Sequence, residues 1–283
     1  MSEKYNYIIG DIHGCYDELL KLENKIKIHA DKNNVSPYII SVGDLIDRGY
    51  KSNQVVEHFI QGKKNNTHQA IMGNHELLMI EALLEFAPEN FNNINYPGWL
   101  YTYPKNYKEK RGVSSLVSWN DYRIGTKNIW ISQGGYSTLC SFDCTPHEVD
   151  TWKIPEYILS FMMNLPFYYE SENFITTHAL PLPHDLSLFV HTPEDGFKNN
   201  PLEIRNAGHS MVWNRNMPEE SIYGEKLHVS GHTPLYRVKR NRKANALQID
   251  TSCVFGGRLT AYCPETNEII SVKAHKDYLQ YEN

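Results

Sequence analysis

The stretch that decides the fold is Gly-Asp-Ile-His-Gly at residues 10–14, which directly follows the apolar run 7–9. Two further stretches repeat this design, Gly-Asp-Leu-Ile-Asp-Arg-Gly at residues 43–49 and Gly-Asn-His-Glu at residues 73–76. Each follows a short apolar run typical of a buried strand and precedes apolar residues at helical spacing. Strands that alternate with helices predict an α/β fold, in which ligand sites lie where parallel strands end.

Two later apolar runs also end in histidine, Phe-Ile-Thr-Thr-His at residues 174–178 and Leu-His-Val-Ser-Gly-His-Thr-Pro at residues 227–234. A single histidine at a strand end is more often structural, but five strand ends with the same chemistry indicate a shared site. The candidate metal ligands are Asp11, His13, Asp44, Asn74, His178 and His232. These oxygen and imidazole ligands suffice for two divalent ions if one carboxylate bridges them, and two ions roughly 3.5–4 Å apart can clamp a phosphate.

In this order the motifs resemble those of the metal-dependent phosphoprotein phosphatases, and most of all the bacterial and bacteriophage branch typified by lambda phosphatase. Trp-Asn-Arg at residues 213–215 and the segment 249–260 also look like that branch. The resemblance spans about residues 5–263 and is looser at 87–150 and 181–210. It implies a calcineurin-like metallophosphoesterase fold, with two mixed β-sheets packed face to face between outer helices.

The resemblance also implies a role for each matching residue. Asp11 and His13 would hold one ion, Asp44 would bridge, and Asn74, His178 and His232 would hold the second. His75 would be the general acid, with Asp47 hydrogen-bonded to it, and Arg48 and Arg215 would bind the phosphate. These side chains suit the roles, because arginine matches phosphate oxygens in pairs and a carboxylate partner orients an imidazole.

The implied reaction is hydrolysis of phosphomonoesters by direct attack of a metal-bridging hydroxide. We expect two ions, with Mn²⁺ favoured over Fe²⁺ or Zn²⁺. The expected substrates and partners are proteins or peptides that carry phosphoserine or phosphothreonine, with phosphotyrosine as a further substrate. Two alternatives stay open: a symmetrical hydrolase of dinucleoside polyphosphates such as diadenosine tetraphosphate, and a non-catalytic pseudophosphatase. Glu76 and Asp47 favour the protein phosphatase, because the tetraphosphatases more commonly have aspartate at the first position and lack the second carboxylate.

Length and composition set the remaining expectations. The 283 residues suit a single domain, 1–283, with an inserted helical and aromatic cap at about 87–150. The formal charge of −5 and the absence of a strongly basic half do not favour nucleic-acid binding. Five cysteines without a close Cys-x-x-Cys pair favour reduced thiols, and no apolar run suggests a signal or a membrane span. A cytoplasmic protein is therefore expected, and its oligomeric state is left open.

Overall fold

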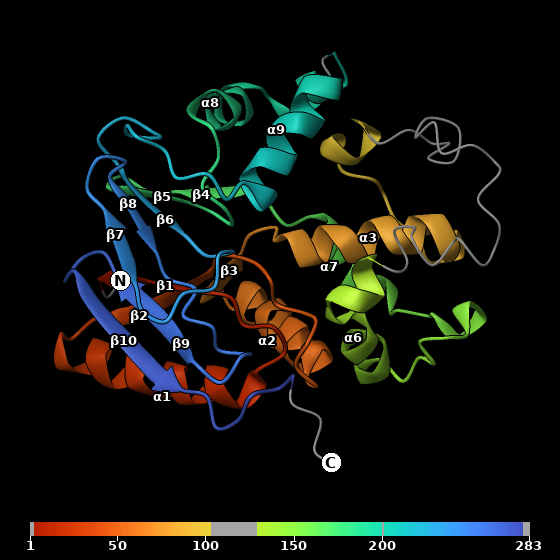
Figure 1. Cartoon of the computed structure of the whole chain (residues 1–283), viewed down its shortest axis with the longest axis horizontal. Helices are drawn as coiled ribbons and strands as arrows, with labels where there is room; N and C mark the ends of the chain where they lie inside the picture. Colours follow the sequence, from red (N-terminus) through yellow and green to blue (C-terminus); the bar gives the residue numbers. More distant parts are fainter. Residues whose placement is uncertain (1–2, 103–128, 200, 280–283) are drawn as a thin grey trace.

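Two five-stranded β-sheets form the centre of the computed structural model, which describes residues 3–102, 129–199 and 201–279 (Figure 1). The first sheet has the order β10-β9-β1-β2-β3, and the second has the order β4-β5-β6-β8-β7. The strands of the first sheet are β1 (Lys4–Ile9), β2 (Ser36–Ser41), β3 (His68–Ala70), β9 (Arg258–Cys263) and β10 (Glu268–Lys273). Those of the second are β4 (Tyr168–Glu170), β5 (Phe174–Thr177), β6 (Leu227–Ser230), β7 (Lys239–Asn241) and β8 (Ala246–Gln248).

Both sheets are mixed, as predicted. Strands β1, β2 and β3 run parallel, and β9 joins β1 antiparallel. In the second sheet β5, β6 and β8 run parallel, and β4 and β7 form antiparallel edges. The parallel strands of each sheet therefore end on the same side, where the motif loops begin.

The side chains of each strand alternate between the two faces of its sheet, and this alternation determines how the two sheets pack. In β1, Ile8 packs with Phe174 of β5 and Val229 of β6 in a small core between the sheets, whereas Tyr7 and Ile9 belong to the larger core beneath the helices. Successive side chains of a strand point to opposite faces, so a continuous apolar run indicates a strand that is buried on both. The apolar run at 7–9 has this arrangement.

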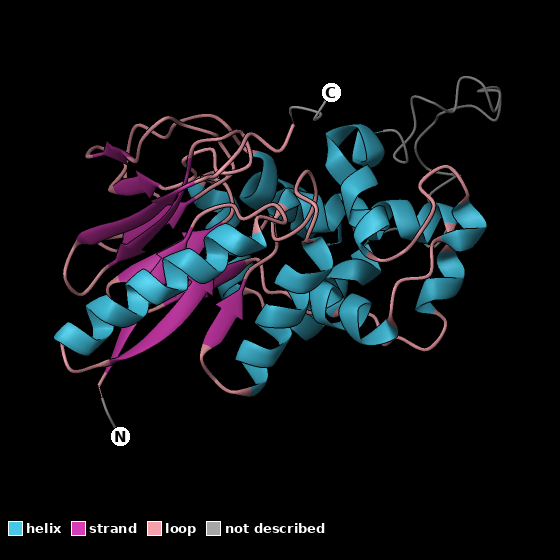
Figure 2. Cartoon of the chain, turned by 90° about the horizontal axis from the view of Figure 1, so that it is seen from below, coloured by secondary structure: helices cyan, strands magenta, loops and turns pink. Residues whose placement is uncertain are grey.

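Helices cover the outer faces and one end of the sheets (Figures 1 and 2). Figure 1 shows α1 and α2 side by side along the first sheet, and α8 and α9 near the second sheet. The helices are α1 (Tyr16–Lys32), α2 (Ser52–Lys64), α3 (Asn74–Phe86), α6 (Tyr136–Ser141), α7 (Glu156–Met163), α8 (Pro183–His191) and α9 (Pro201–Trp213). Shorter helical turns are η1 (Pro88–Phe91), η2 (Gly98–Thr102), η4 (Ile131–Gly135), η5 (Val149–Thr151) and η6 (Glu194–Asn199).

Of the two segments where the resemblance is loose, residues 181–210 are largely helical. They contain α8, η6 and most of α9. The expected cap at 87–150 is described on both sides of 103–128, and residues 103–128 lie outside the described part. Trp99, Trp130 and Trp152 are buried in the larger core together with α1 and α3, so these aromatic side chains do not form a core of their own.

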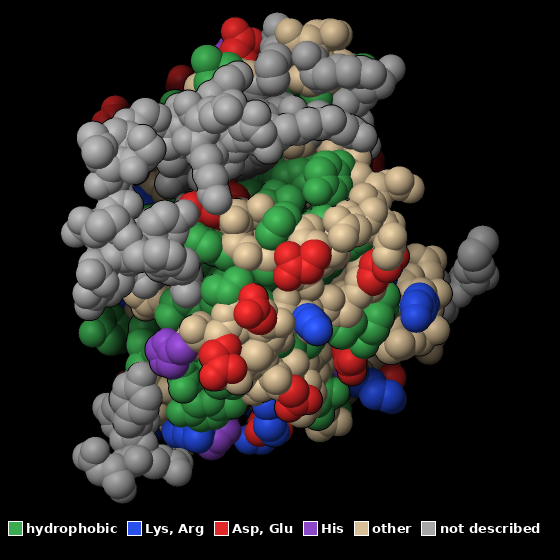
Figure 3. Space-filling model, turned by 90° about the vertical axis from the view of Figure 1, so that its right-hand side faces the viewer, with side chains coloured by type: hydrophobic (Ala, Val, Ile, Leu, Met, Phe, Trp, Pro, Cys, Tyr) green, Lys and Arg blue, Asp and Glu red, His purple; other side chains and the backbone are tan. Residues whose placement is uncertain are grey.

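The surface, the helices and the cysteines add three facts. On the face drawn in Figure 3, acidic side chains stand singly among apolar and polar ones. None of the described helices is both long enough and apolar enough to cross a membrane. All five cysteines are free thiols, which agrees with the expectation from their spacing.

Candidate dimetal site

The strand ends of both sheets bring all ten predicted site residues into one region. The loops after β1 and β2 carry the site residues from Asp11 to Arg48, and Asn74 and His75 begin α3 shortly after β3. The loops after β5 and β6 carry His178 and His232. Arg215 follows α9 and reaches the same region, where its Nε lies 3.3 Å from His232 Nε2. The six candidate metal ligands are buried, none being more than 5% exposed.

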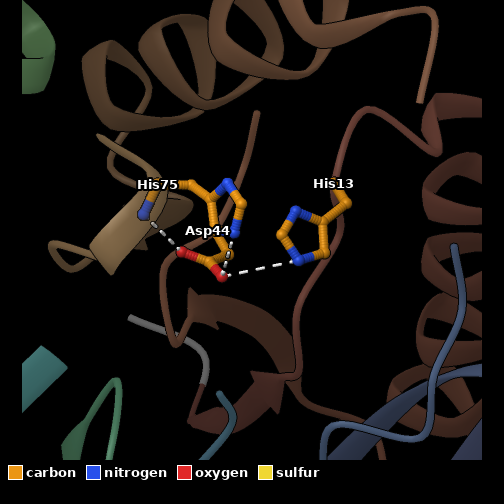
Figure 4. A group of neighbouring side chains, drawn as sticks. All are labelled: His13, Asp44 and His75. Carbon is orange, nitrogen blue, oxygen red and sulfur yellow. Dashed lines mark hydrogen bonds and ion pairs between the residues drawn. The ribbon is translucent and has the colours of Figure 1, made fainter. Parts of the chain in front are cut away.

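Asp44 lies at the centre of the site. Its Oδ2 is 3.4 Å from His13 Nε2 and 3.4 Å from His178 Nε2. Its Oδ1 accepts the backbone N–H of His75 at 3.0 Å, so the carboxylate cannot easily rotate (Figure 4). An oxygen equally far from two imidazole nitrogens is well placed to bridge two ions. Separations near 3.4 Å are also usual between two ligands of one small divalent ion.

Backbone carbonyls orient the two imidazoles that flank Asp44. His13 Nδ1 lies 2.8 Å from the carbonyl oxygen of Ile46, and His178 Nδ1 lies 2.8 Å from that of Val42. A carbonyl only accepts, so each Nδ1 must carry the proton and donate it. The Nε2 atoms then direct their lone pairs at the centre of the site. Metal-binding histidines are commonly held in this way.

Asn74 and His232 complete the second group of ligands. Asn74 Oδ1 lies 2.7 Å from His178 Nε2 and 2.9 Å from His232 Nδ1. The backbone N–H of His232 donates to both carboxylate oxygens of Asp11, at 3.1 Å each. Gly231 permits this approach, because a Cβ atom there would lie 1.9 Å from Asp11 Oδ1. Side chains from both sheets thus converge on one point.

The charges of the site also fit cations. Burial, and then the neighbouring carboxylate of Asp250, raises the pKa of Asp11 well above its usual range. Burial opposes ionisation of Asp44 as well, but the imidazoles of His178 and His75 outweigh it and hold its pKa well below the usual range. Burial lowers the pKa of His178, but Asp44 and Asp11 raise it to about 9. A buried group of carboxylates and lone pairs of this kind suits divalent ions, which would displace the imidazole proton.

Backbone strain is concentrated at the site. Five of the ten predicted residues have positive φ, a conformation that residues other than glycine rarely adopt. They are His13 (48°), Asp44 (51°), Asp47 (73°), Arg48 (71°) and His232 (67°). Strain of this kind persists only where the surroundings impose it, and it is typical of functional sites.

His75 is held on the other side of Asp44. Its Nδ1 lies 2.6 Å from Asp47 Oδ2. Asp47 itself accepts from Trp130 Nε1 at 3.0 Å and from Thr138 Oγ1 at 2.6 Å. The sequence did not identify Trp130 or Thr138 as part of the site, and the motifs carry no signal for them because they lie 83 and 91 residues from Asp47.

Arg48 contacts both histidines of the first motifs. Its Nη1 donates to His13 Nε2 at 2.5 Å and its Nη2 to His75 Nε2 at 2.9 Å. Its backbone packs against the chain at Gly134, where a Cβ atom would lie 2.5 Å from Arg48 N. The φ of Gly134 is 116°, so glycine is required there by conformation and by space.

Glu76 supports the loops and does not face the centre of the site. Its carboxylate accepts the backbone N–H groups of Gly73, Asp44, Leu45 and Ile46 at 2.8–3.3 Å. Burial and the charge of Asp44 raise its pKa to about 7. Glu76 therefore serves the backbone of the loops, and its identity does not discriminate between the candidate substrates.

A pocket of about 550 Å³ opens beside Arg48. Aromatic rings line much of it, and Arg48 forms one edge, with its guanidinium carbon 5.4 Å from the centre of the Phe255 ring. Lys276 Nζ lies 4.8 Å from the centre of the Tyr50 ring at the same place. The aromatic lining residues are Tyr50, Tyr136, Phe255 and Tyr278. An aromatic pocket of this size is typical of small-molecule sites.

Comparisons with known proteins agree with this geometry. Residues 7–236 match the family model described as calcineurin-like phosphoesterase. A symmetrical bis(5'-nucleosyl)-tetraphosphatase of Neisseria meningitidis is 36% identical over 290 residues, which cover 95% of each chain. The asymmetrical bis(5'-nucleosyl)-tetraphosphatase PrpE of Oceanobacillus iheyensis is 26% identical over 96% of this chain and 93% of its own.

Two solved structures share the fold. A provisionally assigned diadenosine tetraphosphatase has a TM-score of 0.53 at 19% identity, covering 97% of this chain and 99% of its own. A serine/threonine phosphatase from Saccharomyces cerevisiae has a TM-score of 0.51 at 15% identity, covering 98% of this chain and 81% of its own. At these identities the likeness concerns the fold alone. The predicted calcineurin-like fold is confirmed.

Proposed function

The chain belongs to the calcineurin-like phosphoesterase family, and we propose that it hydrolyses dinucleoside tetraphosphates such as diadenosine tetraphosphate. The observation that carries this proposal is the aromatic pocket beside Arg48. A dinucleotide needs a surface on which a base can stack, next to the groups that bind its phosphates. The names of full-length relatives, including the one at 36% identity, support the same substrate class. We further propose symmetrical cleavage, which converts diadenosine tetraphosphate and water into two molecules of ADP.

The pocket meets two requirements of such a substrate. Tyr136 and Phe255 are 48% and 39% exposed, so their rings can receive a base. Arg48 joins the pocket to His13 and His75, and Lys276 adds positive charge at its edge. A nucleoside in the pocket would place its polyphosphate along Arg48 toward the site.

The residues of the chain then have clear roles. Arg48 and Arg215 bind the phosphate oxygens, and Asp47 holds Nδ1 of His75 so that Nε2 faces the leaving group. A phosphate that draws Arg48 away would free Nε2 of His75, which in its doubly protonated form donates to the departing oxygen. Two divalent ions bound by the six ligands would supply the Lewis-acid polarisation of the phosphoryl group and lower the pKa of the attacking water.

The protein-phosphatase expectation has less support than this proposal. Its argument depended on Glu76 and Asp47, but Glu76 binds backbone N–H groups, and Asp47 serves His75 whatever the leaving group is. The branch typified by lambda phosphatase and the preference for Mn²⁺ stay predictions. A pseudophosphatase has no support in the geometry, because the strand ends assemble all six candidate ligands.

Steady-state kinetics with three substrates tests the proposal. We expect kcat/KM for diadenosine tetraphosphate to exceed that for a phosphoserine peptide and for p-nitrophenyl phosphate by about tenfold or more. Chromatography of the products should show ADP alone. A higher kcat/KM for the peptide would overturn the proposal in favour of the protein phosphatase, and AMP with ATP would refute symmetrical cleavage.

Variants of the pocket test how the substrate is recognised. Phe255→Ala and Tyr136→Ala should raise KM for the dinucleotide by about tenfold, because stacking of a base contributes about 1–3 kcal/mol. They should leave KM for p-nitrophenyl phosphate nearly unchanged. Tyr157→Ala is the matched control, since Tyr157 is 53% exposed on α7 and is not among the residues that line the pocket. Equal effects on both substrates would show that the pocket does not bind the nucleoside.

A further inference from the structure

A second group of metal-ligating side chains lies apart from the dimetal site, on the helical side of the first sheet. Glu23 of α1, His58 of α2 and His68 of β3 direct one atom each to a common point, and these three atoms all lie within 4.8 Å of one another. None of the three belongs to a strand-end motif. Two helices and a strand that are separated along the chain therefore contribute one ligand each.

The separations suit a small divalent ion. His58 Nε2 lies 2.8 Å and His68 Nε2 lies 3.3 Å from the same oxygen, Glu23 Oε1. Ligands about 2.0–2.2 Å from a tetrahedral zinc ion stand about 3.3 Å apart, which the His68 distance matches. The His58 distance is shorter, so its ring would move outward by about 0.5 Å to share an ion. The three side chains are only 11–21% exposed, so an ion would be held mostly by protein and would keep one open position toward solvent.

The tautomer of His68 requires a proton or a cation between its ring and the carboxylate of Glu23. Thr67 Oγ1 donates to the carbonyl oxygen of Gly62 at 3.1 Å, so it can only accept from His68 Nδ1, which lies 2.8 Å away. Neutral His68 then carries its lone pair on Nε2, facing Glu23 Oε1. Two acceptors cannot face each other at 3.3 Å without a proton or a cation between them.

The backbone is shaped for this arrangement. A Cβ atom on Gly62 of α2 would lie 2.2 Å from the ring of His68, so only glycine leaves room for the imidazole. Glycine is unfavourable within a helix, and here it lets the ring pack against α2. The rings of His58 and His68 lie edge to face with centres 5.1 Å apart, which leaves both Nε2 atoms directed at Glu23.

We propose that Glu23, His58 and His68 form a third metal site, which takes a divalent transition-metal ion of the Zn²⁺ class and links α1, α2 and β3. Two imidazoles and one carboxylate are a usual ligand set for zinc, with a water molecule at the open position. Ion pairs alone would leave one carboxylate shared by two protonated rings, whereas a divalent ion leaves both rings neutral. Burial would raise the pKa of Glu23, but the imidazoles of His58 and His68 outweigh it and lower this pKa to about 2, so the carboxylate is ionised and suited to a cation.

Metal content measures the site directly. Protein stripped with a chelator, loaded with Zn²⁺ and freed of unbound ion should hold one more zinc ion per chain than His58→Gln/His68→Gln treated in the same way. His184→Gln, which removes an exposed histidine of α8, is the matched control and should bind as many ions as the wild type. Because the readout is a difference of one ion, it does not depend on how many ions the dimetal site holds.

Two further measurements separate a metal site from a pair of salt bridges. Added Zn²⁺ should raise Tm of the wild type more than Tm of Glu23→Gln, because binding stabilises the folded state. Hydrolysis by the Mn²⁺-loaded variants should stay within about twofold of the wild type, which also verifies that they are folded. Equal zinc content in the wild type and in Glu23→Gln, or in the double variant where it folds, would overturn the proposal and leave the proposed hydrolase untouched.

Discussion

The two sides of Asp44 are built from different parts of the chain. On the side of His178, Asn74 and His178 come from motifs that follow strands, and the backbone carbonyl of Val42 orients the imidazole of His178. On the side of His75, the support comes through Asp47 from Trp130 and Thr138, far away in the sequence. The candidate metal ligands are therefore encoded in local motifs, whereas the orientation of His75, the proposed general acid, depends on packing between distant segments.

The largest effect on metal content and hydrolysis is expected at Asp44, where the two sides meet. Asp44→Asn removes the charge that lies 3.4 Å from both His13 and His178, so both ions should be lost together. Hydrolysis should fall by at least about 10²–10³, the scale of losing a main stabiliser of transition-state charge. Elemental analysis measures the ions, with Asp31→Asn, an exposed carboxylate of α1, as the control. Two ions still bound to Asp44→Asn would show that this residue does not bridge.

His75→Asn changes only the His75 side of Asp44 and leaves the candidate metal ligands in place. Both ions should stay bound, while kcat should fall by about 10²–10⁴, the range of a lost general acid. Since the proton matters most for a strongly basic leaving oxygen, the loss should be greater with a phosphoserine peptide than with p-nitrophenyl phosphate. Equal losses on the two substrates would mean that His75 positions the substrate and does not protonate the leaving group.

Thr138→Val tests whether the hydrogen bond from Thr138 to Asp47 contributes to catalysis through His75. It removes the hydroxyl that donates to Asp47 Oδ1 but keeps the shape of the side chain, so kcat should fall by about tenfold at unchanged metal content. Trp130→Phe, which removes the indole N–H, should act in the same direction. Thr145→Val, at an exposed threonine, is the matched control. A fall in kcat there as large as in Thr138→Val would remove the distinction between the two sides of Asp44.

The smallest effect is expected away from Asp44, on the stability of the fold, at the carboxylate of Glu18. Buried Glu18 of α1 accepts from the backbone N–H of His275 at 3.1 Å and from the Tyr278 hydroxyl at 2.6 Å. Burial would raise the pKa of Glu18, but these donors outweigh it and lower the pKa. Its stabilisation is therefore complete above the ordinary value of 4.5 and is lost as the pH falls through the lower value in the folded protein.

Urea unfolding at two pH values checks this sign. Glu18→Gln should lower the free energy of unfolding by about 1–2 kcal/mol at pH 7, the scale of hydrogen bonds to a charged group. The difference from the wild type should shrink as the pH is lowered toward the acid limit of stability. A difference that stays constant with pH would mean that Glu18 acts through packing and not through its charge.

Much of the fold and of the candidate site could be predicted because the signals are local. The apolar runs before residues 10–14 and 43–49 lie largely within β1 and β2, whereas β3 ends at Ala70, before Ile71 and Met72 of the third run. All three motifs still follow the carboxyl ends of their strands. Positive φ at Asp44 and Arg48 occurs within the tight turns that the glycines of residues 43–49 allow. The proposed substrate was harder to infer from the sequence, because the rings that line the pocket come from segments as distant as Tyr50 and Phe255.

The sequence by itself determined where the strands end and which ligand types stand there, because a strand and its following turn are encoded by neighbouring residues. Only the tertiary structure decided that Trp130 and Thr138 hold Asp47, and that Glu76 serves the backbone of the loops. It alone brought Glu23, His58 and His68 together across two helices and a strand. Such contacts depend on how whole elements pack, and no short pattern of residues records the packing of surfaces that are distant in the chain.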